Sequence, residues 1–444
     1  MGIFTEDRAR AVLENVIRRS KADECTAALD GGLDGNIRFA KSSVTTTGVV
    51  SNTELAVRVA FGRRVGTATV NAFDDASIQQ VVARAEETAR LAPENPEFMP
   101  AIEKQAYRPS DTFFERTAGI TPELRASIAA QAIGPCQKEG VVAAGFLADG
   151  QRFSAIANSK GNFGYQTSTA LDFTCTVRTE DGRGSAWLGR NLADVGRLDV
   201  KADMKGVIEK TKRSVDPKPL APGKYTVILE PAAGAGLLLY MAFGFDARRA
   251  DEGRSFLAKK GGGNRLGEKM FDSRVHVYAD PWHPETAALP WDEEGLSRER
   301  TEIIRDGVVS YLHYSRYWAK EKGKRAVGLP GNLIMDGADA SLEDLIRSTE
   351  RGVLVSRTWY IRMVDPETLL LTGLTRDGTF YIENGEIRHP VQNFRFNESP
   401  ALMLQNLEAL GRPERVGDDD MSFLMMIPPM KVRDFTFTSQ SDAV

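Results

Sequence analysis

The sequence predicts an α+β protein with two lobes: a mixed α/β N-terminal domain over residues 1–220 and an antiparallel, β-rich C-terminal domain over residues 221–444. The 444 residues exceed the roughly 250–300 at which one hydrophobic core stops growing, so at least two lobes are expected. The proline-rich stretch DPKPLAPGK, which ends at Lys224, separates a helical segment from an apolar strand and marks the boundary. Beyond it, dipeptides typical of hairpin turns recur between strand-like runs.

The N-terminal lobe begins with alternating helical and strand patterns. Apolar residues at three- and four-residue intervals indicate surface helices, and short β-branched or aromatic runs indicate strands. These patterns predict helices over residues 7–19 and Ala76–Ala92, and strands at Ile37–Ser42, Leu55–Phe61 and Val65–Thr69.

The middle of the chain is punctuated by proline. The string PENPEFMP, ending at Pro100, is expected to be an extended connector, and Thr121 before Pro122 predicts the start of a helix. From Phe163 to Val177 the odd positions are apolar or aromatic except for two threonines, and mostly polar residues lie between them, which predicts one long strand. The next strand is expected at Tyr225–Leu229, after the boundary.

Three dipeptides in the C-terminal lobe can supply the positive φ angles of tight hairpin turns: Asp306-Gly307, Asp377-Gly378 and Asn384-Gly385. They predict antiparallel pairing in this lobe. A short helix is also expected over Leu342–Arg351, because Ser341 and Asp344 have the spacing of a capping box.

Composition argues against several functional classes. The 57 basic and 61 acidic residues give no net field to attract nucleic acid or anionic lipid. Cys25, Cys136 and Cys175 lack C-x-x-C spacing, so neither a disulfide framework nor a thiolate metal site is indicated. The charged, amphipathic N-terminus and the lack of a long apolar run predict a cytoplasmic protein without a membrane span.

Direct motif searches find no phosphate-binding loop, no G-x-S-x-G elbow and no H-E-x-x-H zinc helix. Gly234-Ala235-Gly236 lacks the third glycine of a dinucleotide fingerprint, so close helix packing is the better interpretation. The histidines are scattered, which favours structural or exposed roles over metal binding. They are His276, His283, His313 and His389.

Charged segments offer weaker candidates. The acidic clusters Asp292-Glu293-Glu294 and Asp418-Asp419-Asp420 could bind a cation or form an acid/base pair, although like charges more often lie on solvated loops. Lys259, Lys260 and Arg265 flank three glycines and could close over a peptide carboxylate, or simply belong to a flexible loop.

A series of phrases in order gives a more specific indication: GRRVGTAT, NSKGNFGYQTST, PGKYTVILEPAAGAGLLLY, WDEEG, PGNLIMDG, SLEDLIRSTERGVLV and LTGLTRDGTFYIENGEI. Their order and spacing over nearly the whole chain resemble the TldD/PmbA family, whose TldD-type members carry His-Glu-x-x-x-His after the LEP strand and a C-terminal cysteine for zinc.

The resemblance implies that the metal motif is degenerate here. Tyr240, Met241 and Phe245, hereafter the motif positions, stand where the first His, the Glu and the second His are expected, and no cysteine occurs in 422–432. Zinc requires His, Cys or carboxylate donors, so no metal or cofactor is expected in this chain and zinc is expected only in a TldD-type partner. Met241 and Phe245 are expected to share one apolar helix face.

The implied function is that of a PmbA or TldE-like subunit, inactive alone, which pairs with a TldD-type chain or with itself and acts on peptides or unfolded proteins. Two alternatives remain open from sequence. The chain could be a stand-alone, metal-independent enzyme in which Tyr240 donates a proton, or a homodimeric peptide-binding scaffold.

Overall fold

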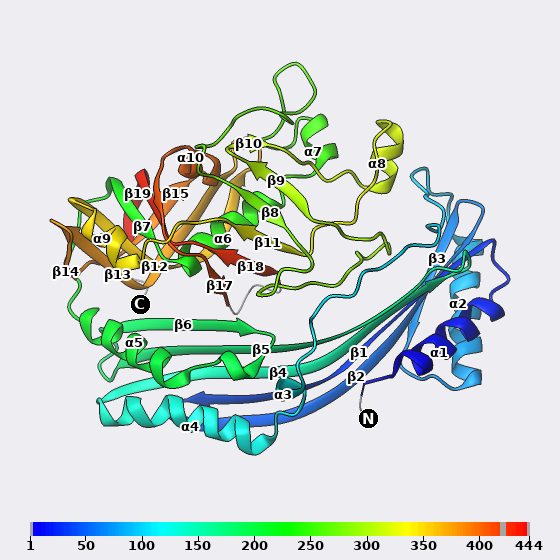
Figure 1. Ribbon diagram of the computed structural model, residues 1–444, viewed down its shortest axis with the longest axis horizontal. Helices are drawn as coiled ribbons and strands as arrows, with labels where there is room; N and C mark the ends of the chain where they lie inside the picture. The colour runs from blue at the N-terminus through cyan, green and yellow to red at the C-terminus, as the bar shows by residue number, and fades with distance from the viewer. Residues whose placement is uncertain (1–2, 418–422, 442–444) are drawn as a thin grey trace.

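The computed structural model describes residues 3–417 and 423–441. A long curved sheet built by the N-terminal part runs along the bottom of Figure 1, and the C-terminal half, with two further sheets, lies above it. This arrangement confirms the α+β prediction, with a mixed α/β N-terminal part and a mainly antiparallel, β-rich C-terminal part. No helix in the described ranges combines the length and apolar character needed to cross a bilayer.

The N-terminal sheet has the order β3-β2-β1-β4-β5-β6, and every neighbouring pair is antiparallel. Its strands are β1 (Glu24–Ala40), β2 (Ser43–Phe61), β3 (Arg64–Val70), β4 (Val141–Asn158), β5 (Phe163–Thr179) and β6 (Ser185–Leu192). The long strand predicted from Phe163 is therefore confirmed. The predicted strand Ile37–Ser42 is wrong at its end, because Lys41 and Ser42 adopt positive φ and form the turn between β1 and β2.

Helices cover one face of this sheet, the lower one in Figure 1. They are α1 (Glu6–Arg19), α2 (Asp75–Leu91), α4 (Pro122–Lys138) and α5 (Val200–Arg213), with the short α3 (Glu115–Ala118) and a 3-10 turn at Val195–Arg197. The predicted helices are confirmed at their starts. Thr121 caps α4 by accepting a hydrogen bond from the Leu124 backbone N–H at 3.3 Å, as the Thr-Pro pair predicts.

Alternation along the strands gives the sheet two different faces. On β5, the odd residues Leu171, Phe173, Cys175 and Val177 are fully buried against α4 and α5. The even residues on the same strand point to the opposite face, toward the C-terminal half. They include Ser168, Ala170, Asp172, Thr174 and Thr176, all of which line a cavity.

The C-terminal half contains two sheets with a helix between them. One has the order β10-β9-β8-β11-β18-β17; in the other, the pairings of β12, β7, β19, β15 and β13 close into a ring, to which β14 and β16 are attached. The strands are β7 (Gly223–Leu229), β8 (Val277–Ala279), β9 (Thr301–Arg305), β10 (Val308–Val309), β11 (Asn332–Met335), β12 (Arg351–Asp365), β13 (Leu370–Glu383), β14 (Glu386–Pro390), β15 (Asn393–Glu398), β16 (Leu407–Leu410), β17 (Glu414–Val416), β18 (Leu424–Ile427) and β19 (Met430–Ser441).

Helix α6 packs against both of these sheets, through contacts with β12, β17 and β18. The remaining helices of this half are short. The bounds are α6 (Pro231–Ala242), α7 (Ala247–Asp251), α8 (Arg316–Glu321), α9 (Leu342–Arg347) and α10 (Pro400–Gln405). Close packing explains the glycines of α6, because a Cβ on Gly234 would lie 2.4 Å from the Met430 side chain and one on Gly236 would lie 2.8 Å from Ile361.

Two of the three predicted hairpins are confirmed, at Asp306-Gly307 between β9 and β10 and at Asn384-Gly385 between β13 and β14. The third prediction is wrong. Asp377 and Gly378 have positive φ but lie inside β13, where the pairing with β12 shifts register, so they form a bulge. The capping box of Ser341 is present, as predicted. Helix α9 ends at Arg347 rather than at residue 351, because strand β12 begins at Arg351.

The bulge directs the Asp377 carboxylate toward the N-terminal sheet, which it helps to attach. Asp377 is 3% exposed; it accepts a hydrogen bond from the Ser185 hydroxyl of β6 and lies 3.5 Å from the Arg357 guanidinium. Arg357 in turn lies over the ring of Trp187 on β6, 4.1 Å from its centroid. A buried polar cluster therefore joins β6 to β12 and β13.

Candidate functional site

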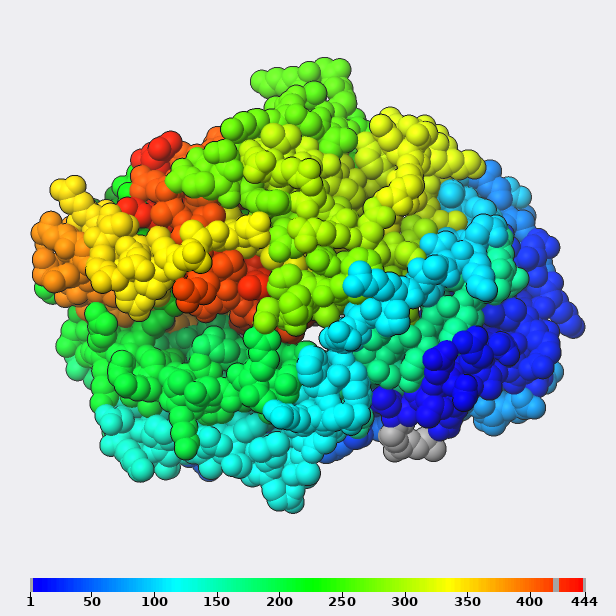
Figure 2. All heavy atoms as spheres, in the orientation of Figure 1, coloured from blue at the N-terminus to red at the C-terminus, as the bar shows by residue number. Residues whose placement is uncertain are grey.

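A cavity with a volume of about 1040 Å³ lies between the free face of the N-terminal sheet and the C-terminal half. Its lining comes from β1, β4, β5 and β6 on one side and from loops and strand ends of the C-terminal half on the other. Figure 2 shows an opening at this boundary, where the cyan connecting segment meets the green strands and the yellow-green loops. The volume is at the upper end of the roughly 300–1,000 Å³ typical of ligand pockets.

The sheet wall of the cavity presents mostly hydroxyl and small apolar side chains. Thr174, Thr176 and Ser168 come from β5, and Phe146 of β4 is 39% exposed beside them. The alternation that buries the odd residues under the helices therefore makes this wall polar. Such a surface can accept and donate hydrogen bonds along an extended chain without selecting one side chain.

The opposite wall is formed by segments that are distant in sequence. The loop 284–289 contributes Pro284, Glu285 and Leu289, and two arginines, Arg298 and Arg415, come from a loop and from β17. Glu285 is paired with Arg197, 2.5 Å away.

Arg415 connects the two walls. Its Nε and Nη2 donate to the side-chain oxygen of Asn191 on β6 at 3.1 and 2.5 Å, and the Asn191 amide donates in turn to the Asp172 carboxylate on β5. Nη1 donates to the Glu285 backbone carbonyl. Burial lowers the pKa of Arg415 to about 10, although Asp172 and Glu285 oppose the effect, and burial also lowers the pKa of Arg298. Both arginines are thus partly buried, and neither guanidinium has an ion pair among residues 3–417 and 423–441.

The motif positions do not line this cavity. Met241 is fully buried and Phe245 is 4% exposed, both within the apolar core around α6, and the Tyr240 hydroxyl donates to the Ile361 carbonyl at 2.7 Å. The expectation that Met241 and Phe245 share a helix face is wrong, because α6 ends at Ala242 and the chain turns there.

The residues at the motif positions do not fit zinc. A thioether and a phenyl ring enclosed by hydrocarbon offer none of the nitrogen, thiolate or carboxylate donors that zinc takes, and the phenol is engaged with the backbone. Within residues 3–417 and 423–441, no group of three or more His, Cys, Asp and Glu side chains is placed to hold one metal ion.

The glycine-rich segment containing Lys259, Lys260 and Arg265 is remote from the cavity lining. Gly261, Gly262 and Gly263 all adopt positive φ, so the segment is a tight loop. Glu268 lies 2.8 Å from the Lys259 amine and 3.0 Å from the Arg265 guanidinium, while Lys260 is exposed. The structure therefore pairs two of the three cations within the loop itself.

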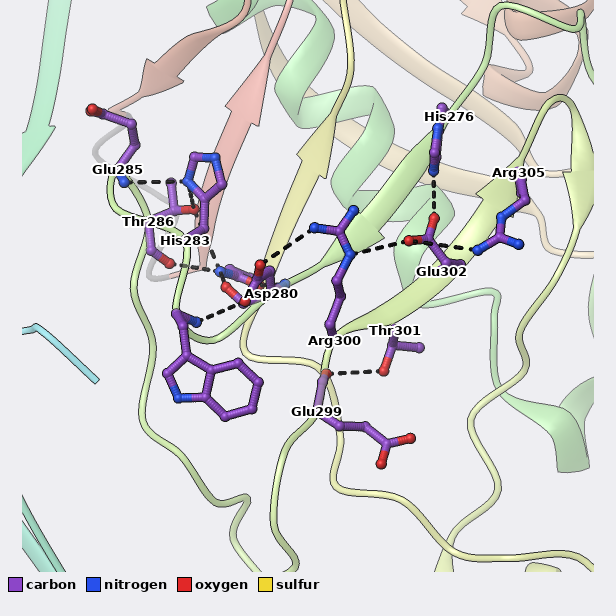
Figure 3. A network of polar contacts seen from close by, with 12 residues as sticks. His276, Asp280, His283, Glu285, Thr286, Glu299, Arg300, Thr301, Glu302 and Arg305 are labelled. Carbon is purple, nitrogen blue, oxygen red and sulfur yellow. Dashed lines mark hydrogen bonds and ion pairs between the residues drawn. The ribbon is translucent and has the colours of Figure 1, made fainter. Parts of the chain in front are cut away.

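The four histidines are dispersed, and two of them appear in the polar network of Figure 3. His276 contacts the Glu302 carboxylate, which also binds Arg300, and His283 accepts a hydrogen bond from the Glu285 backbone N–H at 3.2 Å. Burial lowers the pKa of His313, whose Nδ1 lies 3.0 Å from the Tyr311 hydroxyl.

The fourth histidine, His389 on β14, stacks on Tyr381 of the neighbouring strand β13, with the centroids of the two side chains 5.4 Å apart. The histidines therefore lie in separate environments and do not converge on one site.

The acidic and cysteine candidates have structural surroundings where they are described. Asp292 is 7% exposed and accepts backbone hydrogen bonds from Glu294, Leu296 and Leu329, which identifies it as the anchor of a turn. Asp418-Asp419-Asp420 lies outside the described residues. All three cysteines are buried as free thiols, and burial raises the pKa of each.

Sequence reasoning missed Arg298, Arg415, Asn191 and Asp172. The period-two pattern of β5 does identify Asp172 as a residue of the face opposite Phe173. The two arginines had no signal, because neither belongs to a motif and each is placed by tertiary contacts.

Comparisons with known proteins agree with this architecture. Profiles described as PmbA/TldA metallopeptidase domain 1, central domain and C-terminal domain match residues 31–89, 94–213 and 222–439. PmbA, a metalloprotease of Escherichia coli O157:H7, is 22% identical over 96% of this chain and 95% of its own length. A metalloprotease of Archaeoglobus fulgidus is 29% identical, and the match spans 52% of this chain but only 56% of that protein.

Among solved structures, TldE from Thermococcus kodakarensis superposes with a TM-score of 0.88 at 20% identity, covering 96% of this chain and all of that one. This likeness concerns the fold. Because the three consecutive profiles together span most of the sequence, the chain belongs to the PmbA/TldD family of metalloprotease-related proteins.

Proposed function

We propose that this chain is a TldE-like subunit of a two-chain peptidase, in which a TldD-type partner bearing His-Glu-x-x-x-His supplies the metal. The observation that carries the proposal is the burial of Met241 and Phe245 in an apolar core. Activation of water requires a Lewis acid or an oriented base, and these side chains provide neither. The contribution of this chain is then to enclose and position peptide or unfolded protein, which lowers a barrier without a catalytic side chain.

A surface beside the motif helix supports the subunit role. Phe243, directly after α6, is 62% exposed, and Tyr360 and Val364 at the end of β12 are 55% and 54% exposed. These segments are adjacent, because the Tyr240 hydroxyl is bonded to Ile361. Exposed aromatic and aliphatic side chains gathered in one region are typical of protein interfaces, so we assign this surface, Phe243 with Tyr360–Val364, to the partner.

Activity measurements test the proposal directly. A disordered protein substrate is incubated with this chain, with a TldD-type partner, and with both. The mixture should cleave it in a chelator-sensitive way, whereas this chain alone should not. Chelator-resistant hydrolysis by this chain alone would refute the subunit role and favour the stand-alone enzyme.

Interface variants separate the partnership from the chemistry. Phe243→Asp with Val364→Asp should weaken association with the partner, measured by sedimentation, and reduce cleavage in proportion. Leu91→Asp is the matched control, because Leu91 is 79% exposed on α2 in the other half of the molecule and should change neither. Association unaffected by the double variant would remove the assigned interface.

Metal content gives an independent test. Since the motif positions supply no zinc donors, we expect the purified chain to contain no stoichiometric zinc or iron after dialysis. One tightly bound metal per chain by elemental analysis would contradict the role proposed here.

A further inference from the structure

The two arginines of the cavity share an unusual set of partners. The Nε and Nη1 of Arg298 donate to the backbone carbonyls of Leu329 and Leu289 at 2.7 and 3.1 Å, and Arg415 binds the Asn191 amide and the Glu285 carbonyl. All of these acceptors are neutral. Across the described ranges, no carboxylate lies within ion-pair distance of either guanidinium, in contrast to Arg152 in the same cavity, which is paired with Asp34 at 2.8 Å.

Removing a guanidinium from water is unfavourable unless an anion compensates it. A guanidinium carries five N–H donors. The contacts of Arg298 use fewer than five, and the Nη2 of Arg298 makes no hydrogen bond within the described ranges. Two such cations in one cavity wall thus retain both charge and donors for an anionic ligand. Arginine is suited to this, because its planar fork matches a carboxylate.

Of the three acidic residues in the lining, Asp111 is exposed and the other two are already engaged. Glu285 is paired with Arg197, and Asp172 accepts the hydrogen bond from the Asn191 amide. The facing wall carries hydroxyl groups, including those of Thr174 and Ser168, which suit a peptide backbone rather than a second anion. The cavity therefore has two partly buried arginines on one wall and a polar wall facing them, which also carries Arg38 and the paired Arg152.

We propose that Arg298 and Arg415 form a carboxylate-binding subsite, which holds either the C-terminal carboxylate or an acidic side chain of an extended peptide lying along the β5 wall. The proposal rests on the proposed function in one respect, namely that peptide occupies this cavity. It specifies the substrate class further, since peptides with a carboxylate at the right position would be retained over neutral ones.

Binding measurements with the purified chain test the subsite. The probes are dye-labelled hexapeptides of Ala and Ser with a free C-terminal acid, with a C-terminal amide, and as an amide with one Glu. Fluorescence anisotropy should show the free acid binding roughly tenfold more tightly than the amide, the difference of one charge-assisted contact. If the Glu-containing amide binds as tightly as the acid, the subsite takes side-chain carboxylates; if it binds like the plain amide, it takes the C-terminus.

Variants locate the effect. Arg298→Gln and Arg415→Gln should each reduce the preference for acid over amide, whereas Arg152→Gln, which removes a paired arginine from the same cavity, should leave it unchanged. Arg298→Lys and Arg415→Lys retain the positive charge and should keep most of the preference for acid over amide. If a variant loses the preference because it is misfolded, its circular dichroism spectrum changes and the lysine variant loses the preference as well.

Three results would overturn the subsite: equal binding of acid and amide, a preference that persists in the Arg298→Gln, Arg415→Gln double variant, or no binding of any probe up to about 1 mM. None of these decides whether the chain is a protease subunit, because partner-dependent cleavage of a disordered protein is measured separately. The two proposals can therefore fail independently.

Discussion

Strand β5 and helix α6 arise from two different sequence patterns, and the comparison explains where this chain can act on a ligand. Alternation along β5 buries Phe173 and exposes Thr174 to the cavity, so half of the strand remains available for contacts. Helix α6 is apolar on nearly all sides and packs against both C-terminal sheets, so Met241 is unavailable. In this chain the helix of the family metal motif is a core element, and the polar groups lie on the cavity walls.

The largest expected effect comes from restoring the motif residue in the helix. Met241→Glu should lower the free energy of unfolding by about 5 kcal/mol, the upper end for an uncompensated buried charge, because the side chain is fully enclosed by hydrocarbon. Urea denaturation followed by circular dichroism measures it. Met241→Leu keeps the volume and should cost less than about 1.5 kcal/mol. A stable Met241→Glu protein would show that the core around α6 can accommodate a carboxylate and is less closed than its burial indicates.

A neighbouring pair on β5 tests the two-faced sheet. Phe173→Ala should destabilise the protein by about 3–5 kcal/mol, since Phe173 is fully buried under the helices. Thr174→Ala, one residue along on the cavity face, should change stability by less than about 0.5 kcal/mol. Similar costs for both would mean that the cavity face is packed as tightly as the helix face.

The Asp377 cluster gives a smaller effect. Asp377→Asn should lower the free energy of unfolding by about 2–3 kcal/mol, because the substitution weakens the hydrogen bonds that the charged carboxylate accepts. The effect is not larger because the contact with Arg357, at 3.5 Å, is loose. Asparagine tolerates the positive φ at this position, so the backbone should be unaffected.

Asp306→Asn is the control for this variant. It changes the Asp of another Asp-Gly dipeptide with positive φ, but on an exposed turn, and should cost less than about 0.5 kcal/mol by urea denaturation. Equal effects of the two substitutions would show that the carboxylate contacts of Asp377 contribute nothing to stability.

Elements set by local patterns could be predicted from sequence. The alternation of β5, the cap at Thr121 and the turn at Asn384-Gly385 each depend on residues within a few positions, so period and turn chemistry identify them. The Asp377-Gly378 prediction was wrong for an instructive reason. Positive φ is required by a bulge as well as by a turn, and only the pairing with β12 distinguishes the two.

The candidate site was less predictable, because its walls come from segments that are far apart in the sequence. Arg415 reaches Asn191 across 224 positions of sequence, and nothing in the residues around either one indicates the contact. The resemblance to a family located the motif positions but not the cavity, which lies elsewhere in the fold.

The smallest expected effect concerns His313. Its backbone N–H donates to the Phe245 carbonyl at 2.7 Å, so the titration of His313 reports on the segment that follows α6. Burial lowers the pKa of His313 in the folded protein, against about 6.5 for an unfolded histidine, although Asp246 and Asp292 oppose the shift. Near pH 8 the imidazole is neutral in both states and its contribution to stability is complete. As the pH falls, the unfolded chain takes up the proton first, so the free energy of unfolding decreases, by at most about 1.4 kcal/mol per pH unit.

His313→Gln, which cannot titrate, should remove that part of the decrease between about pH 7.5 and pH 5.5, measured by urea denaturation at each pH. Measurement near pH 8, where the histidine is neutral in both states, separates any constant effect of the substitution. If the variant and the original chain lose the same stability on acidification, His313 is solvated in the folded state, and the region after α6 is wetter than its packing against Phe245 implies.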